Sequence, residues 1–411
     1  MPNYLAPGVY IEEVPSGSRP IEAVGTSTAG LVGVAPNAGA FPNEARGINN
    51  WAQFLKEYVP AGGGASTPLS HAVHGFFLNG GSRCYVVNVG PSGQLAGDAR
   101  GRKGLDLFEE IDEIAIVAAP GFTDAATYDA VLSHCEKLAD RVAVLDAPAT
   151  VSSIGALTKV ATAGPTKKKK PGDEAAPAAA EPAGGDAAGC RPRQSDRGFG
   201  AVYFPYITVR DPLNPKEMVD VAPSGHLAGI YARTDATRGV HKAPANEIIR
   251  GALDVSYRIT RQEQEELNPE GVNCIRLFGR EGIRVYGART VAASSSEWRY
   301  LNVRRLFNMV EESIARSTRW VVFEPNDRPL WKAVRRDVSA FLTLLWRQGA
   351  LMGRTPEEAF FVQCDEETNT QEEIDAGRVV AVIGIAPVKP AEFVIFKIGQ
   401  WVGGTQVESQ A

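Results

Sequence analysis

Cysteine is sparse in this chain, and its spacing suggests neither a metal site nor a disulfide framework. Five cysteines occur among 411 residues, at positions 84, 135, 190, 274 and 364. Their number is odd and no two lie close together in sequence, which argues against zinc motifs and against the even sets of small secreted proteins. Cys84 and Cys274 lie in apolar, strand-like runs, so we expect these thiols to be buried.

Long apolar runs and an excess of basic residues are also missing. No stretch approaches the roughly 18 apolar residues of a membrane-spanning helix. Residues 1–11 lack the basic start and apolar core of a signal peptide. The formal net charge is −5, whereas nucleic-acid and anionic-membrane binders are usually basic. We expect no nucleic-acid partner, no direct membrane insertion and assembly in the cytoplasm.

The common phosphate-loop and zinc-helix motifs are absent as well. Residues 25–29 resemble a nucleophile elbow, but Ala29 stands where the second glycine belongs. His71 and His74 share a helical spacing, yet the sequence offers no third ligand beside them. We therefore expect no catalytic site, no metal and no cofactor.

One polar cluster leaves an enzymatic alternative open. His226, Asp235 and His241 are residue types used in acid–base catalysis. The basic residues among them would instead pair with carboxylates and fasten loops; these are Arg233, Arg238 and Lys242. We favour the structural role.

The chain is otherwise rich in alternating apolar strands and amphipathic helices. Hydrophobic residues make up 44% and charged residues 22%, a normal globular composition with enough length for two or more domains. Strands are predicted at 29–35, 84–89, 114–119, 142–146 and 199–210, the last broken at Pro205. Helices are predicted at 51–58, 69–78, 125–138 and 226–233, and a loop at 239–246. Continuous apolar strands between helices predict an α/β fold with a sheet covered on both faces.

The last third predicts a second set of elements. Amphipathic helices are expected at 302–315 and 330–351, with a strand and turn at 320–327 between them. A strand end near 384 is followed by a proline-bounded turn and a final strand.

Residues 163–197 differ from the rest in composition. Four lysines at 167–170 precede a tract rich in Ala, Pro and Gly that lacks large apolar residues. Such a segment cannot offset the entropy lost on ordering, so it predicts a mobile surface insertion. The lysines could bind an acidic partner, but a solvated charge run is the simpler interpretation.

The amino terminus is punctuated by prolines. Four prolines lie within residues 1–20, and Val9 and Ile11 share one face of a short extended stretch between them. Such a strand cannot bury itself alone. It is either a frayed end or an arm that pairs with the edge of a sheet.

Several motifs together resemble the contractile-tail sheath family, which forms the outer tube of contractile phage tails, R-type bacteriocins and phage-tail-like injection particles. They are LAPGVYIEE (5–13), PSGHLAGIYARTD (223–235), GVHKAPAN (239–246), NVRRL (302–306), FEPND (323–327), GRTPEEAFFVQCD (353–365) and IAPVKPAEF (385–393). The lysine/alanine insertion is the main departure from the pattern. The motifs occur near both ends of the chain and are distributed over most of its length.

The resemblance implies a structural subunit that polymerises. Stacked hexameric rings would surround an inner tube in a metastable extended state and contract to drive the tube through a target envelope. Expected partners are further copies of the chain, the inner tube protein, and baseplate and terminal cap proteins. The alternatives are an α/β enzyme of unknown substrate and a non-contractile adhesive module of the same particle.

The resemblance also implies a domain plan. An N-terminal arm would span 1–20, an outer α/β domain 21–240, an inner sheath domain 241–392, and a C-terminal strand and arm 393–411. The inner domain would be built from both chain ends, with the outer domain inserted between them.

Three groups of residues are then expected to contact partners. The N-terminal arm would use Val9, Tyr10, Ile11 and Glu12. The C-terminal strand would use Phe393, Val394, Ile395, Phe396 and Ile398. On the helix 330–351, the basic face formed by Lys332, Arg335 and Arg336 would turn toward an acidic tube, or would simply be solvated.

Overall fold

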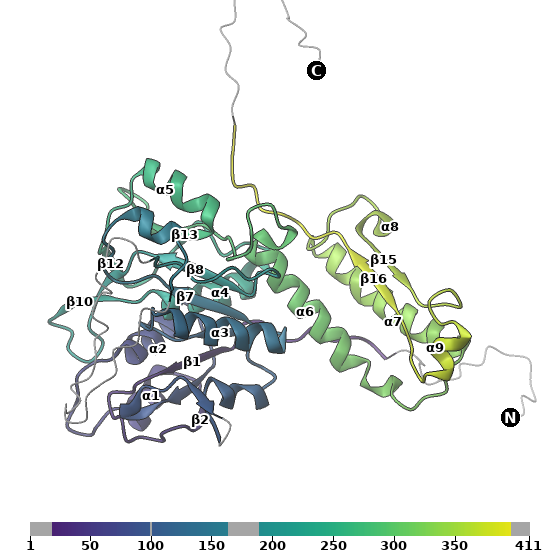
Figure 1. Cartoon of the computed structure of the whole chain (residues 1–411), viewed down its shortest axis with the longest axis horizontal. Helices are drawn as coiled ribbons and strands as arrows, with labels where there is room; N and C mark the ends of the chain where they lie inside the picture. Colours follow the sequence, from purple (N-terminus) through teal and green to yellow (C-terminus); the bar gives the residue numbers. More distant parts are fainter. Residues whose placement is uncertain (1–18, 99–100, 163–188, 396–411) are drawn as a thin grey trace, which may run out of the picture.

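The fold consists of a sheet-based body and a smaller helical part (Figure 1). The structure is a computed structural model that describes residues 19–98, 101–162 and 189–395. The expected contacts of Val9–Glu12, the lysines at 167–170, and Phe396 and Ile398 lie outside the described residues. No helix among the described residues is long and apolar enough to cross a membrane.

A nine-stranded mixed sheet forms the centre of the body. Its order is β11-β14-β13-β8-β7-β6-β1-β3-β2, and the strands from β13 to β3 run parallel. The bounds are β1 Ala29–Gly33, β2 Ala45–Ile48, β3 Cys84–Asn88, β6 Ile116–Ala118, β7 Val142–Asp146, β8 Gly200–Phe204, β11 Glu247–Ile248, β13 Val272–Phe278 and β14 Gly282–Tyr286. The expected α/β class is confirmed, and the buried strands β1, β7 and β8 explain their continuous apolar sequence.

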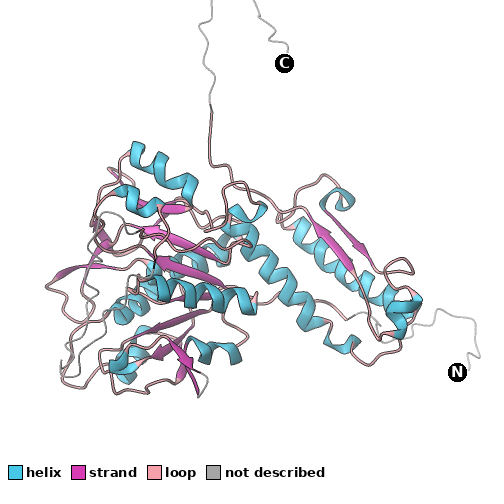
Figure 2. Cartoon of the chain, in the orientation of Figure 1, coloured by secondary structure: helices cyan, strands magenta, loops and turns pink. Residues whose placement is uncertain are grey.

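Helices cover both faces of this sheet (Figure 2). Helices α1 (Trp51–Tyr58), α2 (Pro68–Leu78) and α4 (Ser224–Arg238) pack on one face. Helices α3 (Ala125–Leu138) and α5 (Arg261–Leu267) pack on the other. Along β1, Leu31 belongs to the first core and Val32 to the second, as the alternation of a strand requires.

Smaller strands complete the body. Strands β9 (Ile207–Arg210), β10 (Met218–Val221) and β12 (Ala252–Val255) form a three-stranded sheet, and β4 (Ala96–Asp98) pairs with β5 (Gly101–Gly104). Pro205 interrupts the predicted strand between β8 and β9, as expected, and its peptide bond with Phe204 is cis. Cys84 and Cys274 are buried, which confirms the prediction for both thiols.

The helical part is built on two long helices. Helix α6 (Leu301–Ser317) leaves the body, and α7 (Arg328–Arg347) carries a two-stranded antiparallel sheet made of β15 (Phe360–Gln363) and β16 (Val382–Ile385) (Figure 1). Short helices α8 (Pro356–Ala359) and α9 (Gln371–Asp375) lie in the connections. A third apolar core joins these elements, and Ile21 from the N-terminal segment belongs to it.

The strand expected at 320–327 is wrong. Residues 319–321 form a short 3₁₀ turn, and Val322 and Phe323 are exposed on the loop between α6 and α7. The β-branched residues favour a strand locally, but no strand within the described part of the chain pairs with them. The helix expected to reach 351 ends at Arg347.

The strand end expected near residue 384 is present, but the final strand expected after the turn does not form within the described residues. The strand end near residue 384 is β16, whereas residues 386–395 form no strand. The division at residue 240 stays a prediction. The nine-stranded sheet takes β11, β13 and β14 from beyond that position, so any such division would cross a continuous sheet.

Helices α2 and α4 approach so closely that only small residues fit between them. A Cβ on Gly225 would lie 2.2 Å from the Cα of Ala72, and one on Gly229 would lie 2.4 Å from the carbonyl oxygen of Phe76. A Cβ on Gly75 would lie 2.2 Å from the imidazole Nδ1 of His226. This contact accounts for the glycines in the middle of α4, which otherwise weaken a helix.

Substituting Gly229→Ala should therefore destabilise the protein. Alanine gains about 1 kcal/mol of helix propensity, but overpacking against the backbone of α2 costs roughly 1–3 kcal/mol. We expect a net loss of up to about 2 kcal/mol in the free energy of unfolding, measured by urea denaturation of the monomer. Thr237→Ala, on the exposed end of α4, is the matched control and should stay within about 0.5 kcal/mol. A stabilised Gly229→Ala protein would contradict this packing.

Burial of His226 should make the same helix pair sensitive to acid. Burial, with the charges of His74 and His71, lowers the pKa of His226 to about 3. Below the unfolded value of about 6.5 the unfolded chain takes up a proton that the folded chain refuses, so stability falls as pH falls. Asp146 acts in the opposite direction, because burial raises its pKa to about 6.

Comparison with the His226→Gln variant isolates the contribution of His226 to the loss of stability at low pH. Between pH 7 and pH 5 the wild type should lose about 2 kcal/mol more stability than the variant. Urea denaturation at both pH values measures the difference, and the remaining titrating groups contribute equally to both proteins. Parallel pH profiles for the two proteins would show that His226 is not the cause.

Candidate functional site: two anchored chain ends

The parallel sheet has a strand order typical of nucleotide-binding enzymes, but side chains close its ligand-binding edge. Ligands of such folds bind beyond the carboxyl ends of the strands. There the side-chain Oδ1 of Asn88 accepts hydrogen bonds from the amides of Ala35 and Gly90, both at 3.1 Å. Its Nδ2 donates to the carbonyls of Ala38 and Ala40, at 3.1 and 2.7 Å. The loops after β1 and β3 are thereby tied together.

The acid at the end of β7 is likewise occupied. The amide and hydroxyl of Ser224 donate to the carboxylate of Asp146 at 2.8 and 2.6 Å, and the amide of Gly121 donates at 3.3 Å. Asp146 therefore holds the start of α4 against the sheet. Its raised pKa follows from burial rather than from a catalytic arrangement.

The suspected acid–base residues do not come together as a catalytic group. Asp235 pairs with Arg305, while His226 is buried against Gly75. Two of the neighbouring basic residues fasten loops, as expected. Arg233 donates to the carbonyls of Asn79 and Ile248, and Lys242 donates to the carbonyl of Ala243. No group of three or more potential metal ligands occurs among the described residues, His71 and His74 included.

The N-terminal segment, residues 19–26, lies along α6. The amides of Val24 and Glu22 donate to the hydroxyls of Ser313 and Ser317 on α6, at 3.0 and 3.3 Å. Alternate residues of an extended chain advance about 7 Å, close to the roughly 6 Å between helix positions four apart. The distance between the two serines along α6 therefore matches the distance between alternate amides of the extended segment. Their spacing on an apolar helix face was a signal that the sequence interpretation did not use.

Further out, the same segment reaches α7. The amide of Arg19 donates to the carboxylate of Asp337 at 3.4 Å, and the guanidinium of Arg19 lies 4.6 Å from the ring centre of Trp320. Ile21 is buried among the side chains of α6 and α7. The segment thus links the sheet body to both long helices (Figure 1).

A buried ion pair fixes the inner end of this segment. Arg305 of α6 donates to both carboxylate oxygens of Asp235 on α4, at 2.9 and 2.6 Å. It also donates to the carbonyl of Thr26 at 3.0 Å, and the hydroxyl of Thr26 donates to Asp235 at 2.5 Å. Bidentate, charge-assisted bonds of this kind are strong and geometrically specific. Three separate parts of the chain therefore meet at one point.

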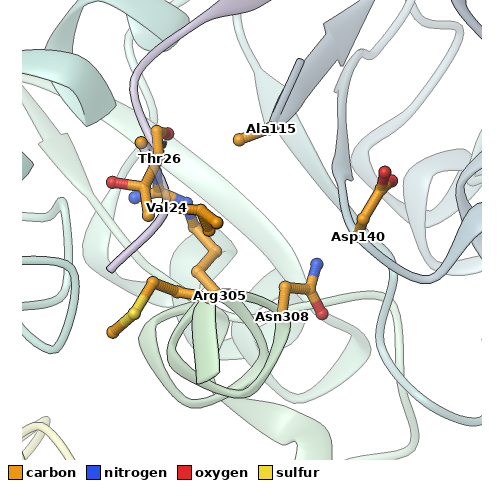
Figure 3. A pocket seen from close by; sticks show the side chains of 8 residues that line it. Val24, Thr26, Ala115, Asp140, Arg305 and Asn308 are labelled. Carbon is orange, nitrogen blue, oxygen red and sulfur yellow. Dashed lines mark hydrogen bonds between the residues drawn. The ribbon is translucent and has the colours of Figure 1, made fainter. Parts of the chain in front are cut away.

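Little space remains around this ion pair. Figure 3 shows Arg305 rising from α6 toward Thr26, with Asp140 of the body across a small void. The void measures about 20 Å³, room for about one water molecule. The junction between the N-terminal segment and the body is therefore closely packed.

A second ion pair, between buried Arg289 and partly buried Glu392, anchors the C-terminal chain. The guanidinium of Arg289 donates to both oxygens of Glu392, at 2.8 and 2.7 Å. Asn268 and Tyr300 also donate to this carboxylate, at 3.0 and 3.3 Å. Burial alone would raise the pKa of Glu392, but these hydrogen bonds and the charge of Arg289 outweigh it and lower the pKa.

Immediately after this anchor the chain becomes exposed. Phe393, Val394 and Ile395 are 71%, 73% and 80% exposed, respectively. Figure 1 shows the chain leaving the body at this point. The sequence interpretation chose these apolar residues as contact residues but did not identify the anchor at Glu392.

The basic face of α7 is on the surface. Lys332, Arg335 and Arg336 are all exposed, whereas Trp331, Val334 and Val338 of the same helix are buried in the apolar core. Arg336 does not project freely, because its Nε donates to the carboxylate of the neighbouring Asp337 at 2.8 Å. That carboxylate also accepts the amide of Arg19, so this face adjoins the path of the N-terminal segment.

Comparison with known proteins places this architecture in a family. The phage tail sheath protein central domain matches residues 103–291, and the phage tail sheath C-terminal domain matches residues 293–400. The sheath of the PVC extracellular contractile injection system, in its contracted state, is 31% identical with a TM-score of 0.73, over 98% of this chain and 99% of that chain. The contracted helical sheath of the anti-feeding prophage is 32% identical with a TM-score of 0.69, over 97% and 99%.

Phage proteins are similar over shorter regions. The tail sheath protein of Enterobacteria phage T4 is 30% identical over 41% of this chain and 25% of its own length. A putative prophage major tail sheath protein of Pseudomonas aeruginosa (strain UCBPP-PA14) is 29% identical over 44% and 46%. The chain thus spans about a quarter of the length of the T4 protein. With nearly complete coverage of two injection-system sheaths, these similarities establish that the chain belongs to the phage tail sheath family, whose members are structural proteins and not enzymes.

Proposed function

We propose that this chain is the sheath subunit of a contractile, phage-tail-like injection particle. Copies would assemble in the cytoplasm as stacked hexameric rings around an inner tube, remain in a metastable extended state, and contract to drive the tube through a target envelope. The observation that carries the proposal is the similarity to two contracted sheaths over nearly the whole chain. The two anchored chain ends supply a physical means of linking the copies.

The C-terminal chain is suited to act as a donor. Glu392 is held by Arg289, and three large apolar side chains follow it in solvent. Exposed apolar residues in sequence are unfavourable in an isolated monomer and mark a contact surface. Phe393–Ile395, with Phe396 and Ile398 beyond the described residues, would form a strand only on a neighbouring copy.

The sheet formed by β15 and β16 is suited to act as the acceptor. Among the described residues each of these strands has a single strand neighbour, so each leaves one edge unpaired. Its inner face is apolar and packs on α7 through Val362, Ile383 and Ile385. Added strands gain main-chain hydrogen bonds, each contributing about 0.5–1.5 kcal/mol net. The arms at Val9–Glu12 and Phe393–Ile398 are the proposed occupants of these edges.

Contraction of such a polymer requires no nucleotide, because the energy would be stored in its extended state. The anchors at Thr26 and Glu392 would transmit movement of a body to the arms held by its neighbours, because both are fixed by bidentate ion pairs. A coupling of about 1–3 kcal/mol per subunit sums to a large total over many copies. New contacts between bodies would supply this energy during contraction.

The inner tube, baseplate and terminal cap proteins are the remaining proposed partners. A related chain is part of the anti-feeding prophage baseplate structure, to which this chain is 32% identical. The basic face of Lys332, Arg335 and Arg336 is the proposed tube contact. Exposed ion pairs are weak individually, so this face could hold an acidic tube and release it without a large barrier.

Deleting residues 1–14 should abolish sheath assembly and leave a folded monomer. The described anchor at Arg19–Thr26 is retained in this variant, so the body should keep its circular dichroism spectrum and melting temperature. Negative-stain microscopy of the variant expressed with its tube protein measures assembly. Sheaths of normal appearance would refute the exchange of N-terminal arms.

Reversing the charge at Arg335 and Arg336 to Glu should loosen the association of sheath and tube. We expect at least a tenfold weaker co-assembly at low salt and a smaller difference at high salt, because exposed charges are screened. Co-sedimentation with purified tubes measures the effect. Arg280→Glu, exposed on the body, is the matched control. If the wild type, the variant reversed at Arg335 and Arg336, and Arg280→Glu all co-assemble equally with tubes, the proposed tube contact on α7 is wrong.

A further inference from the structure

The loop between α6 and α7 carries an aromatic residue at a turn position that favours glycine. The amide of Glu324 donates to the carbonyl of Val321 at 3.1 Å, which closes a four-residue turn. Val322 has φ −66° and ψ 126°, and Phe323 has φ 70°. These are the angles of a type II turn, whose third residue is usually Gly or Asn because a positive φ crowds a Cβ atom.

The side chain of Phe323 gains nothing from the core of its own subunit. Phe323 is fully exposed, at 102%, and the adjacent Val322 is 63% exposed. The positive φ of a bulky residue costs stability in the monomer, and the ring, left in water, contributes no burial to offset that cost. Such residues are typical of functional contact sites.

The opposite end of the same helix pair contains an unfilled groove of about 360 Å³. Its apolar wall is formed by Leu306 and Met309 of α6, Leu345 of α7 and Val240 of the loop after α4. Ala23, an exposed residue of the N-terminal segment, lies on its rim. The groove is large enough for an aromatic ring.

Charges beside the ring and beside the groove are complementary. Glu324 follows Phe323 directly and is exposed. On the rim of the groove lies Arg238, which is also exposed. Complementary charges orient a contact and exclude wrong partners.

We propose that Phe323 of one copy inserts into the groove of a second copy, with Glu324 beside Arg238. A chain cannot fill its own groove in this way, because the 20-residue helix α7 separates the two sites by about 30 Å. The contact uses different surfaces on the two copies, and such heterologous contacts build rings or helical polymers. The inference rests on the proposed function, since it supplies a body-to-body contact between sheath subunits in addition to the arms.

Phe323→Asn provides a test that does not damage the monomer. Asn fits the turn better than Phe, so the melting temperature of the monomer should stay the same or rise. The yield of sheath, measured by sedimentation and microscopy, should fall at least tenfold. Met218→Ala, which removes a 62% exposed apolar side chain remote from both sites, should assemble like the wild type. Normal assembly of Phe323→Asn overturns the inference.

A cysteine pair identifies the occupant of the groove. Val322→Cys, next to the retained Phe323 ring and 63% exposed in the native chain, combined with Ala23→Cys should form disulfide-linked multimers in assembled sheaths under mild oxidation, and neither single variant should do so. Four of the five native cysteines are buried, which keeps the background low. Linked multimers support the contact. Assembled sheaths without links overturn it, and so does a disulfide link from Val322→Cys to the tube protein instead.

A charge exchange tests the orientation. Glu324→Arg and Arg238→Glu should each reduce the sheath yield, and the double variant should restore at least half of the loss. If the sheath yield of the double variant is no higher than the product of the two single-variant yields, the pairing of Glu324 with Arg238 is contradicted. Failure of the wild-type chain to form any sheath would instead contradict the proposed function, so the two failures are distinguishable.

Discussion

The buried ion pair between Arg305 and Asp235 is the interaction on which the rest of the structure depends. Its side chains are only 3% and 6% exposed, and together they join α6, α4 and the N-terminal segment at Thr26. Removing one partner of such a pair typically costs about 3–5 kcal/mol, because the other charge stays buried. This pair joins the helical part to the sheet body and holds the inner end of the N-terminal segment, residues 19–26.

The two chain ends follow one design. Each is fixed by a bidentate arginine–carboxylate pair: Arg305 with Asp235 at the inner end of the N-terminal segment, beside Thr26, and Arg289 with Glu392 where the C-terminal chain leaves the body. Beyond Glu392 the chain presents apolar side chains to solvent. A rigid base followed by an exposed apolar segment is the arrangement that strand exchange between copies requires, because a loosely held base would not transmit movement.

The sheet body illustrates how little a fold says about activity. Its doubly wound strand order is shared with many nucleotide-binding enzymes. Here the carboxyl ends of the strands are closed by the side-chain bonds of Asn88 and Asp146. The proposed contact surfaces lie instead at the chain ends and on the two-stranded sheet that packs on α7. Family membership agrees with this arrangement, since sheath proteins are structural.

The sequence alone determined the local elements. Helices α1 and α3 and strand β7 have the predicted bounds, because apolar periodicity and caps act within a few residues. It also selected Phe393–Ile395 as contact candidates in a final strand, whereas in the described chain they are exposed and form no strand. It failed at residues 320–327, where strand-forming side chains find no partner strand. Only the tertiary structure decided the strand order and the pairing of Arg305 with Asp235 and of Arg289 with Glu392, because these partners lie 70 and 103 residues apart and local patterns carry no information about them.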